Sequence, residues 1–427
     1  MAQARIFNFH DATADGNMAP MTSSIASPPL PVRALVALCI LNHVALCGAR
    51  LALVEQALRL DVQSFALGLM FAPFALASTL GALPLGRRID RIGARWPALA
   101  GLALTTAALA TAALRPTPLV MAGAAAAIGL GYTAALIALQ SEIARGRDEP
   151  ERRAGFAAFA IGTAASSGFG PFLAGQVLSH AGASATFSVL AGVALLALAC
   201  TAARSTRLQS GPQAVAPTAR ARGSPRGLGG LRRLMLADLG MALAWNANGF
   251  IVPVVTQRHG WPADVAGNLL GCFGAAVLLV RALPHAWRVR GGDWSAIARA
   301  LLASGAVLAL LPLLPSMPLH YLLQVVLGCG LGSSLPSVMA LVETRTPAGR
   351  RAEVLGLRQA VLGFGAATTP TVVGALVAAT GLAPALAVVG GALLALGAGI
   401  APRGAPQVAG AVARMRASNS STPRGNP

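Results

Sequence analysis

The chain of 427 residues is 55% hydrophobic and only 11% charged, whereas an average soluble domain carries about 25% charged residues. Its formal net charge is nevertheless +19, and all 33 basic residues are arginine. The absence of lysine excludes a P-loop ATPase, Schiff-base chemistry and a serine–lysine hydrolase. With a mean hydropathy of +0.65, the composition indicates a membrane protein.

Hydrophobic runs of about 20 residues are long enough to cross a bilayer as helices. The first 30 residues contain no such run, so we expect no cleavable signal peptide. The following runs predict an all-α membrane protein with twelve transmembrane helices, at 34–56, 63–85, 96–114, 118–141, 155–178, 183–203, 234–256, 263–284, 296–314, 319–342, 354–377 and 383–402.

The arginines are distributed unequally between the two sides of this predicted bundle. The termini, the central linker and the connections on the same side hold 27 of the 33, and the opposite side holds Arg59, Arg115 and Arg258. Because positively charged loops stay in the cytoplasm, we expect both termini there, in a bacterial inner membrane. Since topology explains the charge, we expect no nucleic-acid partner.

The two halves of the chain are an internal repeat. A shift of 199 residues aligns 32–203 with 231–402 without gaps, and it places Gly68 on Gly267 and Pro171 on Pro370. Two copies of six spans each have the same orientation, which predicts parallel pseudo-repeats with a substrate path between them. The predicted organisation is a tail at 1–31, bundles at 32–203 and 231–402, a linker at 204–230 and a tail at 403–427.

The connection between the second and third spans carries a sequence motif. It reads Gly86-Arg87-Arg88-Ile89-Asp90-Arg91-Ile92-Gly93-Ala94-Arg95 and resembles the G-x-x-x-D-R-x-G-x-R signature of the major facilitator superfamily. Together with twelve spans and a 6+6 repeat, the resemblance covers nearly the whole chain. The second copy of the motif, at 285–292, has Val289 in place of the acid.

The resemblance implies that Gly86, Asp90, Arg91, Gly93 and Arg95 form a cytoplasmic gate. In that family the carboxylate contacts the start of the eleventh span, here near 351–358, and glycines at such a motif permit a tight turn with close helix approach. The alternative is that Asp90 only caps a turn. The fifth span contains Gly168, Gly170, Pro171 and Gly175, which resemble a degenerate form of the family's antiporter motif. The alternative is that these small residues only let helices pack closely.

Polar residues inside the predicted spans are candidates for the substrate cavity. Arg50 shares a helical face with His43 and Cys47, and a charge near mid-membrane costs about 2.5–3.5 kcal/mol even on the lenient scale. We expect Arg50 to face the cavity and to attract an anion or to pair with Glu55; the alternative is snorkelling, which we also expect of Arg281 and Arg299. The other candidates are Asn42, His43, Tyr132, Gln140, Trp245, Asn246, Asn248, Asn268, Ser333 and Ser334.

These features predict a secondary transporter that moves a small organic solute by alternating access, with efflux of a drug-like compound or metabolite favoured. The alternatives are an uptake permease for a small organic anion and a polytopic sensor that does not transport. We expect a monomer in the lipid bilayer that is not an enzyme and has no metal and no cofactor. No carboxylate lies at mid-membrane in the first half, so coupling to a proton gradient stays open.

Overall fold

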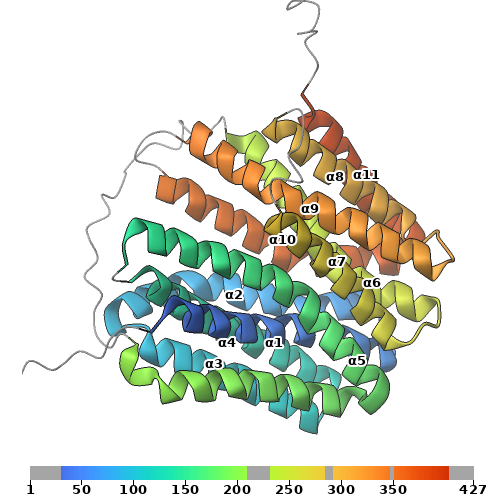
Figure 1. The fold of residues 1–427 in the computed structure, drawn as a ribbon. Helices are drawn as coiled ribbons and strands as arrows, with labels where there is room; N and C mark the ends of the chain where they lie inside the picture. The colour runs from blue at the N-terminus through green and yellow to red at the C-terminus, as the bar shows by residue number, and fades with distance from the viewer. Residues whose placement is uncertain (1–29, 146, 209–230, 284–291, 347–350, 403–427) are drawn as a thin grey trace, which may run out of the picture.

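The computed structural model describes residues 30–145, 147–208, 231–283, 292–346 and 351–402. The regular structure within these ranges is helical, and the helices run beside one another in a bundle (Figure 1). The first half of the chain, blue to green, lies on one side of this view, and the second half, yellow to red, on the other. The predicted tails and most of the predicted linker fall outside the described residues.

The helices follow the predicted spans in order. Their bounds are α1 (Val32–Arg59), α2 (Ser64–Ile92), α3 (Arg95–Leu114), α4 (Pro118–Ala144), α5 (Glu149–Ala203), the 3₁₀ turn η1 (Ser205–Arg207), α6 (Arg232–Arg258), α7 (Ala263–Ala282), α8 (Asp293–Leu310), α9 (Met317–Arg345), α10 (Arg351–Thr380) and α11 (Leu382–Ile400).

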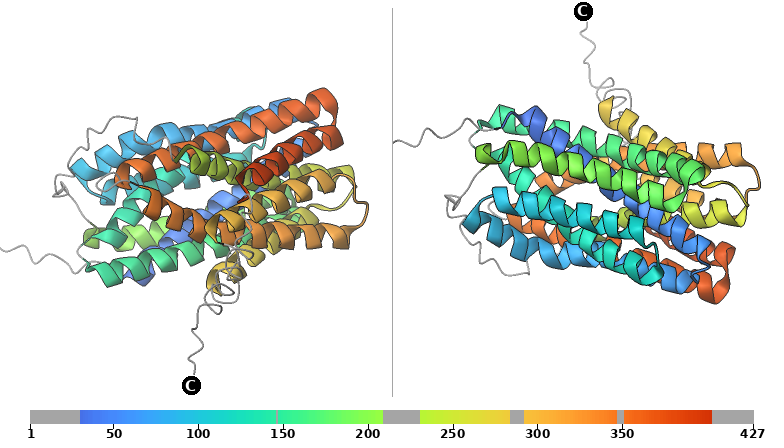
Figure 2. Two further views of the ribbon diagram at one scale, coloured as in Figure 1. Left: turned by 90° about the horizontal axis from the view of Figure 1, so that it is seen from above. Right: turned by 90° about the horizontal axis from the view of Figure 1, so that it is seen from below.

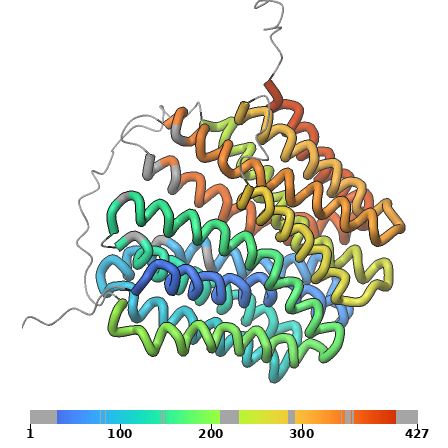
Figure 3. The backbone as a smooth tube through the Cα atoms, viewed as in Figure 1, coloured from blue at the N-terminus to red at the C-terminus, as the bar shows by residue number. Residues whose placement is uncertain are grey.

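Eleven of the described helices are long and apolar enough to cross a membrane, and α5 supplies two crossings. A straight helix of its 55 residues would be about 80 Å long, more than twice the hydrocarbon thickness of a bilayer. The chain instead turns back at Gly182, where φ is 79° and ψ is −179° (Figure 3). The fold is therefore a twelve-span membrane fold, as the sequence predicted.

The internal repeat is also visible in the backbone. Gly93 and Gly292 end corresponding turns with φ values of 84° and 83°, and Gly182 and Gly381 do so with 79° and 85°. Each pair is separated by 199 residues, the shift found in the sequence. A positive φ is readily adopted by glycine and costs other residues free energy, so the repeated glycines mark repeated turns.

The two halves meet along two seams that the repeat relates to each other. The backbone of α2 at Gly68 lies so close to Pro370 in α10 that an added Cβ would be 2.3 Å from the Pro370 oxygen. At the corresponding seam, a Cβ on Gly267 in α7 would be 2.7 Å from the oxygen of Pro171 in α5. Figure 2 shows α10 running beside α2. Small residues permit such close helix approach.

The two ends of the bundle differ in charge. One end, called here the arginine-rich face, comprises the start of α1, the α2–α3 and α4–α5 turns and the facing ends of α9 and α10. The other end is called the opposite face. Toward the opposite face the halves are also joined by hydrogen bonds, from Ser179 to Asp264 at 3.1 Å and from Gln257 to the Leu58 oxygen at 3.1 Å.

The outer surface of the bundle is apolar. Leu114 and Leu119 are 83% and 85% exposed, and Leu80 and Phe364 are more than half exposed. Leucine and phenylalanine at such exposure would be costly in water and are favourable against lipid tails. The surface therefore fits a bilayer environment.

Candidate substrate cavity

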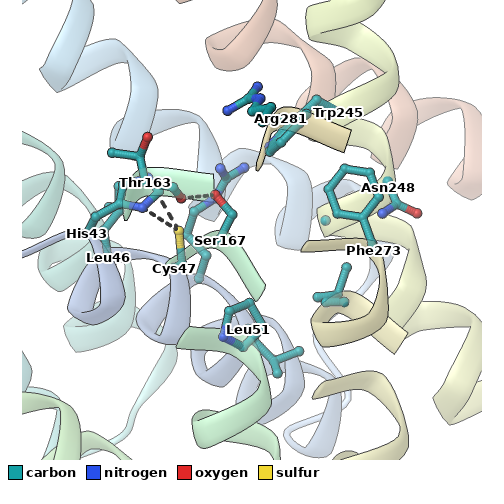
Figure 4. Close-up of a pocket in the computed structure, with 14 residues that line it drawn as sticks. His43, Leu46, Cys47, Leu51, Thr163, Ser167, Trp245, Asn248, Phe273 and Arg281 are labelled. Carbon is teal, nitrogen blue, oxygen red and sulfur yellow. Dashed lines mark hydrogen bonds between the residues drawn. The ribbon is translucent and has the colours of Figure 1, made fainter. Parts of the chain in front are cut away.

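A cavity of about 360 Å³ lies between the two halves of the chain. Its size is at the lower end of the range for small-molecule sites. Helices α1 and α5 form one wall, and α6 and α7 form the other, facing wall (Figure 4). The lining consists of His43, Leu46, Cys47, Arg50, Leu51, Thr163, Ser167, Pro171, Trp245, Asn248, Gly249, Leu270, Phe273 and Arg281.

Arg50 lines the cavity and is bonded to the other half. Its Nη2 donates a hydrogen bond to Oδ1 of Asn246 in α6 at 3.0 Å. The Asn246 amide is itself fixed, because its Nδ2 donates to the Ala242 oxygen at 2.8 Å. Arg50 is therefore held by a neutral amide, and the suggested pairing with Glu55 is not among its contacts in the described residues. The buried Oε1 of Glu55 has no hydrogen-bond partner there.

The wall formed by α1 and α5 is polar. A ring nitrogen of His43 lies 3.6 Å from the sulfur of Cys47, and Ser167 donates a hydrogen bond to the Thr163 oxygen at 2.8 Å. Figure 4 shows these four side chains grouped on one side of the cavity. They bring hydroxyl, thiol and imidazole groups to the cavity; the Thr163 and Ser167 hydroxyl groups donate to backbone oxygens of α5 and keep lone pairs that can accept hydrogen bonds.

The wall formed by α6 and α7 carries an aromatic pair and a hydrogen-bonded amide. The rings of Trp245 and Phe273 meet edge to face with centroids 4.8 Å apart, a favourable arrangement for aromatic pairs. Asn248 exchanges two hydrogen bonds of 2.9 Å with Gln324 of α9, and both side chains are buried. This reciprocal pair fixes the direction of the Asn248 amide at the cavity wall.

Two pairs of lining residues are related by the internal repeat. Leu46 and Trp245 are 199 residues apart, as are Arg50 and Gly249, and all four line the cavity. Corresponding positions on α1 and α6 thus face the same space. The cavity lies where a pseudo-two-fold axis between parallel repeats places a substrate path.

Not all the candidates from the sequence are brought to this cavity. His43, Arg50, Trp245 and Asn248 line it, and Asn246 contacts it through Arg50. Asn42 is buried and donates to the Tyr132 oxygen at 3.3 Å, and the Tyr132 ring lies 5.8 Å from His43.

The remaining candidates have other surroundings. Asn268 accepts a hydrogen bond from Gln176 at 2.9 Å. The hydroxyl groups of Ser333 and Ser334 donate to backbone oxygens of their own helix, and Gln140 is half-buried and is not one of the described lining residues.

Several lining residues were not among the candidates. Thr163 and Ser167 on α5 and Phe273 on α7 have no unusual sequence signal, because hydroxyl and aromatic residues are common in such helices. Arg281 did carry a signal, as an arginine inside a predicted span, but we expected it to snorkel. It lines the cavity, and Figure 4 shows it beside Trp245.

The gate motif lies at the arginine-rich face. Gly93 makes the turn between α2 and α3 with its positive φ. Gly86 lies within α2, and among the described residues nothing lies within 4 Å of a Cβ added there. The described residues therefore show no close helix approach at Gly86, and the gate stays a prediction. Asp90 and Arg91 are exposed in the last turn of α2, and Arg95 begins α3. Of the second copy of the motif, residues 285–291 lie outside the described residues, and Gly292 is described.

The start of α10, where the resemblance places the partner of Asp90, has a different contact. Arg358 forms an ion pair with Asp238 of α6, with Nε 2.7 Å from Oδ2. Both side chains are largely buried, so this pair ties two helices of the second half together. The described contact of the Arg358 guanidinium is therefore with Asp238 and not with Asp90.

The glycines of the span 5 motif lie at helix contacts. A Cβ on Gly168 would be 2.9 Å from the Gly271 oxygen, and one on Gly175 would be 2.8 Å from Cα of Gly267. Gly170 packs against Val44 of α1. Pro171, inside α5, lines the cavity.

Metal-ligating groups are sparse. Within the described ranges, no group of three or more His, Cys, Asp or Glu side chains could hold a metal ion. The five cysteines are free.

Comparison with known proteins identifies the family. The family model described as Major Facilitator Superfamily matches residues 18–294 and 234–420. The chain belongs to this superfamily. It matched no curated protein sequence.

Solved structures agree with this assignment at the level of the fold. A peptide transporter, POT, aligns with a TM-score of 0.73 at 13% identity, covering 87% of this chain and 95% of that one. The nucleoside transporter NupG aligns with a TM-score of 0.69 at 17% identity, covering 87% and 99%. A bacterial homologue of the human lysosomal transporter Spinster aligns with 0.67 at 14% identity, covering 86% and 93%. The chain is thus a multi-pass membrane transporter of the major facilitator type.

Proposed function

We propose that this transporter moves a small organic anion by alternating access, with the anion bound at Arg50. The observation that carries the proposal is the charge of the cavity between the halves. Its described lining contains Arg50 and Arg281 and neither aspartate nor glutamate. Arg50 is bonded to the neutral amide of Asn246, so its charge is not neutralised. A cationic side chain inside a membrane protein favours a counter-ion.

The proposed cargo corresponds to the anion alternative from the sequence rather than to a drug-like compound. Export was favoured on the span 5 motif, and the glycines of that motif have a sufficient explanation in their contacts with α1 and α7. Flux measured in both directions will determine whether the anion enters or leaves.

The proposed orientation follows the arginine distribution. We place the arginine-rich face in the cytoplasm of a bacterial cell and the opposite face outside, because positive loops remain in the cytoplasm. The contacts between halves at Gly68 and Gly267 lie toward the opposite face. In this orientation they close the outer side of the cavity.

The test is anion flux in proteoliposomes, with and without a pH gradient. Arg50→Gln removes the charge while keeping a side chain that can bond Asn246, and loss of one charge-assisted hydrogen bond costs about 1.5–3 kcal/mol. We expect anion uptake to fall by roughly one to two orders of magnitude, with unchanged insertion and thermal stability. Arg258→Gln, at the exposed end of α6, is the matched control. Normal flux in Arg50→Gln would overturn the proposal, and the absence of flux for all anions would favour a sensor.

A further inference from the structure

The cavity contains a second arginine, contributed by the other half of the chain. Arg281 lies one residue before the end of α7 and lines the same cavity as Arg50. Its Nε is buried and has no hydrogen-bond partner among the described residues. In Figure 4 it lies beside Trp245, at the edge of the group of lining side chains. It is therefore part of the cavity and has unused hydrogen-bonding capacity.

Two cations in one cavity require compensation. The described lining includes no carboxylate, and the amide that bonds Arg50 is neutral. Two like charges in a medium of low dielectric constant repel each other, and each has lost part of its hydration. A bound molecule with one negative group compensates one arginine only, whereas a molecule with two negative groups compensates both.

The positions of the two arginines along their helices set the shape of such a molecule. Both distances are measured from the opposite face along the helix axis. Arg50 is nine residues from the end of α1 there, which is about 14 Å at the helical rise. Arg281 is 18 residues from the start of α7 at the same face, which is about 27 Å. The two residues are thus offset along the bundle by about 14 Å before their side chains extend. Long side chains shorten this gap to the length of a small molecule with an acidic group at each end.

We propose that the transported anion carries two negatively charged groups, as in a dicarboxylate or a phosphorylated carboxylate. One group binds Arg50 of the first half, and the other binds Arg281 of the second half. This inference rests on the proposed anion transport and adds to it the number of charges and their positions. Guanidinium groups suit both acids, because they bind carboxylate and phosphate through two parallel hydrogen bonds.

A ligand with two acidic groups would also join the halves. Arg50 on α1 and Arg281 on α7 both line the cavity, so a dianion would contact both halves at once. A monoanion at Arg50 would leave Arg281 uncompensated. Preference for dianions therefore depends on Arg281, whereas anion binding as such depends on Arg50.

Calorimetric titration of the purified full-length protein, with dicarboxylates and monocarboxylates of equal chain length, tests the preference for two acidic groups. The probes are straight-chain dicarboxylates of three to eight carbons, the monocarboxylates of the same lengths, and glycerol phosphate. We expect at least one dianion to bind about tenfold or more tightly than its matched monoanion, since a charge-assisted hydrogen bond corresponds to roughly a 10- to 100-fold change in affinity. Arg281→Gln should remove this preference while monoanion affinity changes by less than about threefold.

Two further variants keep the test informative. Arg281→Lys retains the charge and should keep part of the preference, which a purely structural role of the guanidinium would not produce. Arg258→Gln removes an exposed arginine and should leave both affinities unchanged.

The outcomes separate this inference from the proposed function. If monoanions bind as tightly as dianions, or if Arg281→Gln keeps the preference, the two-charge inference is overturned while anion binding at Arg50 stands. If no acid binds saturably, both proposals fall together. If glycerol phosphate, which has one acidic group, binds as tightly as the best dicarboxylate, a second acidic group is not required and the two-charge inference is overturned.

Discussion

The seam between α2 and α10 allows the alternating-access hypothesis to be tested with a single methyl group. In Gly68→Ala the new Cβ would lie 2.3 Å from the Pro370 oxygen, and ordinary contacts begin near 3.5 Å. The helices must therefore separate by about 1 Å. Overpacking of this kind costs about 1–3 kcal/mol. We assign this cost to the conformation in which the seam is closed.

This cost should shift the equilibrium between the two access states. If the halves separate at the opposite face in the other state, the methyl group is tolerated there, and the ratio of states moves by about 5- to 150-fold. The assay uses Cys47 as the single remaining cysteine, because it lines the cavity and is half-buried. Its rate of labelling by an impermeant maleimide should rise from the opposite face and fall from the arginine-rich face.

A matched glycine controls for helix propensity. Gly123 lies in α4, and no described residue lies within 4 Å of a Cβ added there, so Gly123→Ala should stabilise the helix by about 0.5–1 kcal/mol without a clash. Gly267→Ala, at the corresponding seam with a contact of 2.7 Å, should act in the same direction as Gly68→Ala. Unchanged labelling in Gly68→Ala, in a folded protein, would refute the reasoning that this seam opens during transport.

Three further predictions concern polar contacts. Gln324→Leu leaves the buried Asn248 amide without its partner and should lower stability by about 1–2 kcal/mol, as measured by thermal unfolding in detergent. Adding Asn248→Leu to this variant should recover part of the lost stability. If the effects of the two substitutions simply add, the pairing is contradicted. Asp238→Asn leaves the largely buried Arg358 uncompensated and should cost about 3–5 kcal/mol in the same measurement, so a change below 1 kcal/mol would argue against this ion pair. Asp90→Asn, at an exposed position, should leave stability within about 0.5 kcal/mol but change maleimide access to the cavity from the arginine-rich face; an unaltered pattern contradicts the gate.

The span pattern and the repeat were predictable because their signals are local or periodic. A run of about 20 apolar residues becomes a membrane helix in almost any context, since backbone groups in lipid must bond within the helix. The 199-residue shift reappears as paired positive φ values at Gly182 and Gly381. The glycines of α5 also indicate in the sequence that another helix packs closely against it. They do not indicate that this helix is α7.

The sequence by itself determined the number of spans, the repeat and the charge asymmetry, and it singled out Arg50 as a candidate for the cavity. Only the tertiary structure decided which polar residues share the cavity. Arg281 looked like a snorkelling residue at a helix end, and its place in the cavity depends on how α7 packs against α5. Likewise, Ser333 and Asn268 are as polar as Asn248, yet their helices turn them toward other contacts. The physical reason is that transmembrane helices gain little from the hydrophobic effect once inserted, so their rotation is set by packing against neighbours, which is not local in the sequence.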